Sequence, residues 1–318
     1  MGSKTRVGFP ASVLLAWAGL FVSCGGTARP PPVGRFDPAA VDGDRAYAEV
    51  ADLVALGPRD AGTPGGERAA LHLRGRLEAL GIEAHIDAFE DPTPIGPLVF
   101  RNVVGRLPGR GRGRIILGSH FDTKRGMGPD FEGANDSGSS TGLLLELARV
   151  MAEGPEADPE IWFAFFDGEE SIERYGPRDG LHGSRRMARA LVADGRASGV
   201  RAVIVLDMVG DRDLTITLPH NATPWLLARV LDAASAEGVR ERFRLLPHAI
   251  IDDHEPFLDA GMPAVNLIDF EYGSAPGLND YWHTDEDRMD KIRAESLGIV
   301  GRVTLRLVNT LLGDPAPE

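Results

Sequence analysis

The sequence predicts an α/β protein, a three-layer α/β/α sandwich whose central sheet is mixed and mostly parallel. Residues 161–166 are a continuous apolar run, and residues 114–121 and 202–207 are buried-strand patterns that run into a polar end; such runs are typical of strands buried on both faces. Apolar or amphipathic segments of helical length lie between these runs. Such alternation of strand and helix favours a largely parallel sheet covered by helices on both sides.

Local signals place the remaining elements. Residues 44–56 and 66–80 are predicted helices, the second ending at Gly81, a residue type preferred just after a helix. Residues 82–89 alternate as a strand does, and residues 99–107 are predicted to pair beside them. Further helices are expected at 141–152, 183–193, 224–237 and 291–312, and a further strand at 263–268.

The first residues have the order of an export signal. Lys4 and Arg6 precede an unbroken apolar segment, residues 13–22, and small residues surround Cys24. The apolar segment is too short to span a bilayer, and Cys24 occupies the position of the lipidated cysteine of bacterial lipoproteins. We expect a lipoprotein-type signal peptide at 1–23, a Pro/Gly-rich linker at 24–40 and the folded domain at 41–318. A plain secretory signal is the alternative, so the protein is expected in the bacterial cell envelope, lipid-anchored, or else periplasmic or secreted.

Charge and cysteine content restrict the partners. The chain has 34 Lys and Arg against 47 Asp and Glu, a formal net charge of −13. This charge argues against nucleic acid and anionic membrane surfaces as partners, so membrane contact is expected only through a lipid anchor at Cys24. The single cysteine permits no internal disulfide. We expect a monomer.

Acidic and histidine side chains follow several predicted strands. The run at 161–166 ends in Asp167-Gly168-Glu169-Glu170, and in open α/β sheets ligands bind at the carboxyl ends of strands. Other candidates at strand ends, helix starts and loops are His120, Asp122, Asp136, Asp207, Asp252 and His283. Each could be a helix cap, a strand end or a surface residue. If all of these explanations held, several unpaired acids would lie at one edge of the sheet. Buried charges in proteins are normally paired or bound to metal, so this outcome is disfavoured. Histidine and carboxylate are ligands that zinc accepts.

The set of His-x-Asp, Asn-Asp-Ser-Gly, Glu-Glu, Leu-Asp and His-Thr resembles the zinc aminopeptidase superfamily. Residues 165–170, 179–185, 252–258 and 282–284 are more similar to the glutaminyl-peptide cyclotransferases of the animal type. The resemblance extends from about residue 44 to the C-terminus, which would make 41–318 a zinc-dependent catalytic domain.

The resemblance implies roles for eight residues. It implies that one zinc per chain is held by Asp136, Glu170 and His283. It makes Glu169 the acid/base, in a hydrogen-bonded network with Asp207 and Asp252. Trp282 would wall the substrate pocket, and Tyr175 falls where the animal enzymes have a second pocket tryptophan.

The implied activity is cyclisation of the N-terminal glutamine of peptides or proteins to pyroglutamate, with release of ammonia. The alternative is an aminopeptidase with two zincs that hydrolyses N-terminal residues. Its second metal would use His120 and Asp207, with Asp136 bridging, and Glu169 would activate water. A third possibility is an inactive, lipid-anchored binding protein, which is disfavoured because no ligand or acid is missing. Three features favour the cyclase, namely Asp252, Trp282 and the insertion that follows Glu170.

Overall fold

The computed structural model describes residues 1–3 and 35–313. The predicted signal-peptide cleavage site and Cys24 lie outside these residues. Residues 35–313 belong to one compact unit. In the predicted linker, Phe36 is buried, and its N–H donates to the Asn309 side chain over 2.9 Å. Among the described residues, no helix combines the length and the apolar character needed to cross a membrane.

The described residues form one eight-stranded sheet, with the order β1-β2-β4-β3-β5-β8-β6-β7. The strands are β1 (Glu83–Thr93), β2 (Gly96–Leu107), β3 (Arg114–His120), β4 (Glu160–Phe166), β5 (Val200–Asp207), β6 (Ile216–Leu218), β7 (Phe243–Leu245) and β8 (Ala264–Ile268). The central pairs β4–β3, β3–β5 and β5–β8 are parallel, as is β6–β7, and the other three pairs are antiparallel. The predicted mixed, mostly parallel sheet is confirmed.

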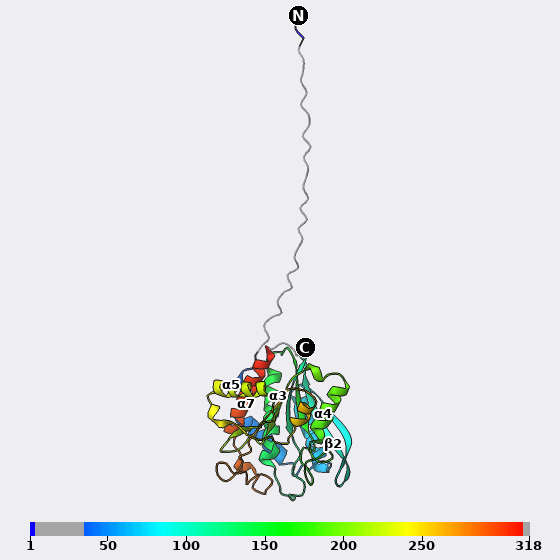
Figure 1. Ribbon diagram of the computed structural model, residues 1–318, viewed down its shortest axis with the longest axis vertical. Helices are drawn as coiled ribbons and strands as arrows, with labels where there is room; N and C mark the ends of the chain where they lie inside the picture. Colours follow the sequence, from blue (N-terminus) through cyan, green and yellow to red (C-terminus); the bar gives the residue numbers. More distant parts are fainter. Residues whose placement is uncertain (4–34, 314–318) are drawn as a thin grey trace. The chain divides into compact units, whose positions relative to one another are not determined.

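Helices cover both faces of this sheet. They are α1 (Gly43–Val54), α2 (Pro64–Ala79), α3 (Ser140–Glu153), α4 (His182–Ala193), α5 (Pro224–Glu237), α6 (Glu255–Asp259) and α7 (Ala294–Leu312). Buried side chains of α1, α2, α3, α5 and α7 share one apolar cluster, and those of α4 and α6 share another. Figure 1 shows α3, α5 and α7 on one side of the sheet and α4 on the other. The predicted three-layer sandwich is confirmed.

Strand β4 shows why its sequence is apolar throughout. Ile161, Phe163 and Phe165 pack into the cluster beneath α3, whereas Trp162 and Phe166 pack into the cluster beneath α4. A strand covered on both faces has no solvent side, so alternation with polar residues disappears. The same burial on both faces leaves only its end, residues 167–170, for polar function.

Three short elements were not predicted, namely β6, β7 and α6. Each contains only three to five residues, too few for a periodic pattern to be read. The last helix begins at Ala294 instead of residue 291, because Met289–Lys291 form a 3₁₀ turn and Arg293 is extended. The predicted helix at 224–237 has the bounds that α5 has in the structure.

Candidate metal centre

The sheet topology brings the predicted strand-end residues together. His120 is the last residue of β3 and lies opposite Phe166 of β4 in the parallel register, so Glu169 and Glu170 follow beside it. Asp207 ends β5, the other neighbour of β3. Asp136 lies in the turn Ala134–Ser139 that precedes α3. Since the carboxyl ends of parallel strands share one edge, these side chains converge there.

Asp136, Glu170 and His283 form a first group of potential metal ligands. His283 Nε2 lies 2.9 Å from Glu170 Oε1 and 3.3 Å from Asp136 Oδ2. Zinc bonds to nitrogen and oxygen of about 2.0–2.2 Å would hold neighbouring tetrahedral ligands roughly 3.4 Å apart, which is close to these separations. His283 has a φ of 55°, a left-handed conformation that is uncommon for residues other than glycine and recurs at functional sites.

His120, Asp136 and Asp207 form a second group that shares Asp136 with the first. His120 Nε2 lies 3.2 Å from Asp136 Oδ1 and 3.3 Å from Asp207 Oδ1. The His120 side chain is only 2% exposed, and its Nδ1 lies 3.5 Å from Asp122. Both groups contain the nitrogen and oxygen donors that zinc accepts, so the donor chemistry fits this metal at either position.

Two further acids orient the ligands. The two oxygens of Asp122 accept the backbone N–H groups of Glu169, at 3.1 Å, and Glu170, at 3.3 Å. Asp287 accepts the N–H groups of Asn135, at 2.7 Å, and of Asp136, at 3.1 Å. The His-x-Asp motif already contained Asp122. An acid four residues after His283 was the only sequence signal for Asp287.

Arg59 was not predicted at all. Its guanidinium is fully buried and donates to the carbonyls of Phe121, Glu132 and Gly133 at 2.8–2.9 Å. It therefore ties the end of β3 to the loop that carries Asp136. Burial lowers the pKa of Arg59 to about 10, which leaves it charged at neutral pH. These partners are brought together only by the tertiary fold, so no local pattern could mark the residue.

The site concentrates carboxyl groups in a buried place. Burial raises the pKa of Glu169 well above its ordinary value, and Glu170 and Asp252 add to the rise while His120 opposes it. Burial and the charge of Asp136 likewise raise the pKa of Glu170 to about 7. When so many acids lie close together, the negative charge of each disfavours ionisation of the others. A bound cation relieves this repulsion. The second oxygen of Glu170 has no hydrogen-bond partner, and the Lys124 ammonium lies 3.4 Å from it.

One cavity of about 260 Å³ lies over this edge of the sheet. All eight predicted site residues line it, together with Met208, Ile250, Ile268 and Phe270. The Trp282 ring stacks on His283 with centroids 4.0 Å apart and packs against Phe270 at 5.4 Å. The cavity thus has an acidic end and an apolar, aromatic wall, the mixture found in small-molecule sites.

The remaining predicted acids make contacts of their own. Glu169, Asp207 and Asp252 line the cavity together, and the carboxylate of Asp252 accepts a hydrogen bond from the Asn266 amide. Asp167, which had no predicted role, accepts the backbone N–H of Arg101 over 2.7 Å and ties the end of β4 to β2. It does not line the cavity.

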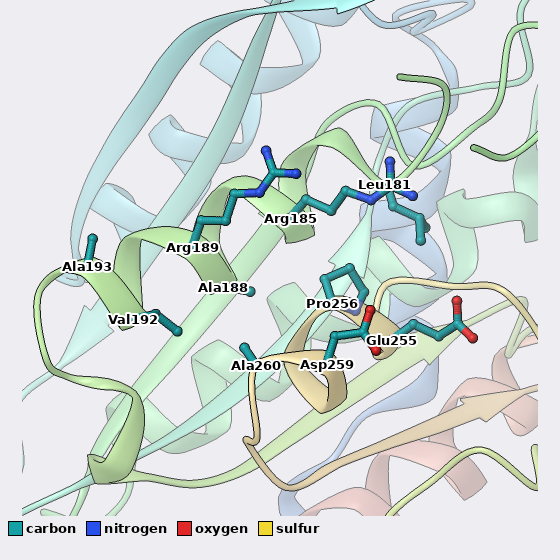
Figure 2. Close-up of a pocket in the computed structure, with 10 residues that line it drawn as sticks. All are labelled: Leu181, Arg185, Ala188, Arg189, Val192, Ala193, Glu255, Pro256, Asp259 and Ala260. Atoms are coloured by element: carbon teal, nitrogen blue, oxygen red, sulfur yellow. The ribbon is translucent and has the colours of Figure 1, made fainter. Parts of the chain in front are cut away.

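A second, larger hollow of about 410 Å³ lies between α4 and α6. Figure 2 shows Arg185 and Arg189 on the α4 side and Glu255 and Asp259 on the α6 side. It contains none of the predicted site residues, and among the described residues no group of metal ligands lies there. Its size is therefore no guide to the chemistry of the protein.

Comparison with known proteins identifies the family. The model of peptidase family M28 matches residues 102–308. The chain belongs to peptidase family M28. A glutaminyl-peptide cyclotransferase-like protein of Bos taurus is 30% identical over 287 residues, covering 80% of this chain and 72% of the relative.

Solved structures of this family are similar throughout the fold. The crystal structure of an Acidobacteriales bacterium glutaminyl cyclase has 34% sequence identity and a TM-score of 0.79, covering 90% of this chain and 98% of that one. A Zn-dependent exopeptidase from Parabacteroides distasonis has 27% identity and a TM-score of 0.75, covering 89% and 100%. The predicted resemblance to glutaminyl cyclases, which are acyltransferases, is confirmed by the cyclotransferase relative and the cyclase structure, and with it the predicted class of enzyme.

Proposed function

We propose that the protein is a zinc-dependent glutaminyl-peptide cyclotransferase, which converts the N-terminal glutamine of peptides or proteins to pyroglutamate and releases ammonia. The observation that carries the proposal is that the two adjacent glutamates make different side-chain contacts. Glu170 lies 2.9 Å from His283, whereas Glu169 points into the same cavity and contacts Tyr175 instead. These contacts support a metal-binding role for Glu170 and a proton-transfer role for Glu169.

Asp136, Glu170 and His283 would hold one zinc per chain. When bound, zinc supplies a Lewis acid that polarises the side-chain amide carbonyl of the substrate glutamine. All three of these residues line the cavity, so a metal that they held would lie beside a substrate bound there.

The substrate provides its own nucleophile. The α-amine of the substrate would bind in the cavity, close to its carboxylates. The α-amine nitrogen then attacks the side-chain Cδ of the glutamine to close the ring. Glu169 accepts a proton from this nitrogen as the new bond forms. It then gives the proton to the amide nitrogen, which leaves as ammonia when the bond to Cδ breaks. A carboxyl whose pKa is raised by burial suits the first step, because it accepts a proton more readily than an ordinary carboxylate does.

The apolar wall serves orientation and water exclusion. Trp282, Phe270 and Ile250 line the cavity beside the carboxylates. A nucleophile within the substrate needs only to be held in the reactive geometry. Side chains that displace water would also suppress hydrolysis of the amide.

A two-zinc aminopeptidase is the second candidate, and the group of His120, Asp136 and Asp207 is the observation that favours it. There Glu169 would activate a water molecule for attack on the peptide bond. The similarity to a Zn-dependent exopeptidase supports the same alternative.

We also propose that the protein is exported and anchored by lipid at Cys24, and that it acts as a monomer. The support is the order of charge, apolar residues and small residues at the N-terminus. Incorporation of labelled lipid by the full chain, and its loss in Cys24→Ser, would support the anchor. An unlabelled full chain would rule it out.

Product analysis separates the two activities. The purified protein is incubated with a Gln-initiated peptide and, separately, with a leucine anilide. Ammonia release from the peptide, with one zinc per chain, is the expected result. Release of the aniline from the anilide, with two zincs per chain, would favour the aminopeptidase and contradict the proposed function.

A further inference from the structure

The hydroxyl of Tyr175 makes an unusual contact with Glu169. It donates toward both carboxylate oxygens, at 3.0 Å from Oε1 and 3.1 Å from Oε2. In the described part of the chain, no other side chain hydrogen-bonds this carboxylate. The neighbouring Glu170, by comparison, lies near both His283 and Lys124.

The loop that carries Tyr175 is held by its own hydrogen bonds. The Asp179 carboxylate accepts the N–H groups of Ile172, Glu173 and Arg174 at 2.5–2.9 Å. Gly176 and Asp179 exchange backbone hydrogen bonds at 2.9 and 3.2 Å. The insertion after Glu170 is therefore a closed turn of defined shape, which fixes where the backbone of Tyr175 lies.

Gly180 lies against the tyrosine ring, and Arg185 holds the backbone of the loop. Gly180 has a φ of 79°, and a Cβ there would lie 2.5 Å from Tyr175 Cδ1. Only glycine leaves room for the ring in this position. Arg185 donates to the carbonyls of Gly176 and Gly180 at 2.8 and 2.9 Å, and the N–H of Leu181 donates to the Glu169 carbonyl over 2.9 Å. The loop is thus tied to the backbone of the residue whose side chain it contacts.

The Tyr175 hydroxyl remains a donor under assay conditions. Burial raises the pKa of Tyr175 well above its ordinary value, and the charge of Glu169 raises it further. A protonated phenol beside a carboxylate forms a charge-assisted hydrogen bond, which is stronger than a neutral one.

We propose that Tyr175 is a positioning residue, whose hydroxyl holds the Glu169 carboxylate in the orientation required for proton transfer. This role differs from lining the substrate pocket, for which only the aromatic ring of Tyr175 would be needed. It rests on the proposed function in one respect, namely that Glu169 carries the proton. Loss of the hydroxyl lets the carboxylate rotate while the cavity keeps its shape.

Tyr175→Phe tests this role because it removes the hydroxyl and keeps the ring. We expect kcat to fall about ten- to a hundredfold, as for loss of a hydrogen bond to a charged group, with KM within about twofold. Zinc content should not change. Tyr47→Phe is the matched control: it removes a hydroxyl that donates to the Met289 carbonyl over 3.1 Å, outside the cavity, and should leave kcat and KM unchanged. An unchanged kcat in Tyr175→Phe, or a rise in KM alone, would overturn the proposal.

The test remains informative if the proposed function is wrong. The variants are assayed on whichever substrate the wild-type protein converts, since Glu169 would also need its orientation to activate water. A crystal structure of Tyr175→Phe gives a readout independent of turnover. We expect the Glu169 carboxylate to be displaced or to occupy two conformations there. A Glu169 side chain in its wild-type position would contradict the positioning role, whatever reaction the protein catalyses.

Discussion

The two groups of potential ligands that share Asp136 differ in their access to substrate. Glu170 and His283 line the cavity with Asp136, and the His283 side chain is 19% exposed. His120, in the other group, is 2% exposed and does not line the cavity. Both groups have suitable donors, so ligand chemistry alone does not separate them.

This difference indicates how one scaffold could support two chemistries. A catalytic zinc needs an open position for substrate or water, and only the group with His283 has all three of its ligands on the cavity wall. In the other group, the ring nitrogens of His120 lie 3.2–3.5 Å from carboxylate oxygens of Asp122, Asp136 and Asp207, so its charge would hold these acids together. We therefore assign the metal of the proposed cyclase to the first group and a structural role to His120.

Replacing the two histidines should give the largest difference between the two groups of ligands. We expect His283→Ala to lose both zinc and activity, because two carboxylates remain where three ligands are needed. The matched variant His120→Asn, which keeps a polar side chain, should retain one zinc per chain. Metal analysis after dialysis checks both. Equal losses of zinc in the two variants would contradict the assignment.

Glu169→Gln should lower kcat about 10²- to 10⁴-fold, the usual contribution of a general acid/base, and should leave zinc bound. The neighbouring Glu170→Gln should instead release zinc, because it weakens a ligand. Steady-state kinetics and metal analysis of the pair check the division of the two glutamates. If Glu169→Gln loses the metal and Glu170→Gln keeps it, the roles are reversed.

Removing zinc should destabilise the protein. A ligand that binds only the folded state adds about 4 kcal/mol when its concentration is a thousand times its Kd. Chelation also leaves the carboxylates of Asp136 and Glu170 close together without the metal between them. We expect the melting temperature to fall by about 2–4 °C per kcal/mol, measured by calorimetry with and without chelator. His283→Ala serves as the control, since chelator should not shift its melting temperature.

The smallest effect is expected at the aromatic wall. Trp282→Phe keeps an aromatic ring beside His283 but reduces its area. It should raise KM about two- to tenfold, in keeping with the energy of an aromatic contact, with kcat and zinc content unchanged. Trp225→Phe, on the exposed surface of α5, is the matched control and should alter neither constant. A fall in kcat without a change in KM would argue against a role for Trp282 in substrate binding.

The long elements and the residues of the cavity could be predicted from the sequence because both depend on the same buried strands. Strands β3, β4 and β5 are buried on both faces, so their apolar runs are easily recognised and their polar ends stand out. Residues such as Asp136, Glu170 and Asp207 lie at those ends or in motifs next to them. The parallel topology then brings them together without further information.

Contacts that depend on loop conformation could not be predicted. Arg59 reaches carbonyls more than sixty positions away, and the role of Asp287 depends on how its loop packs against the turn before α3. Tyr175 was predicted to line the pocket, but its hydroxyl reaches Glu169 only because Asp179 and Gly180 shape the insertion. Side-chain hydrogen bonds of this kind have no periodic signal in a sequence.

Anomalous diffraction at the zinc edge tests the central comparison most directly. Crystals of the full chain are grown with excess zinc, and the peaks are located in the anomalous map. We predict one peak, bounded by Asp136, Glu170 and His283, with none between His120 and Asp207. A second peak of comparable height at His120 and Asp207 would contradict the one-zinc site and favour the aminopeptidase.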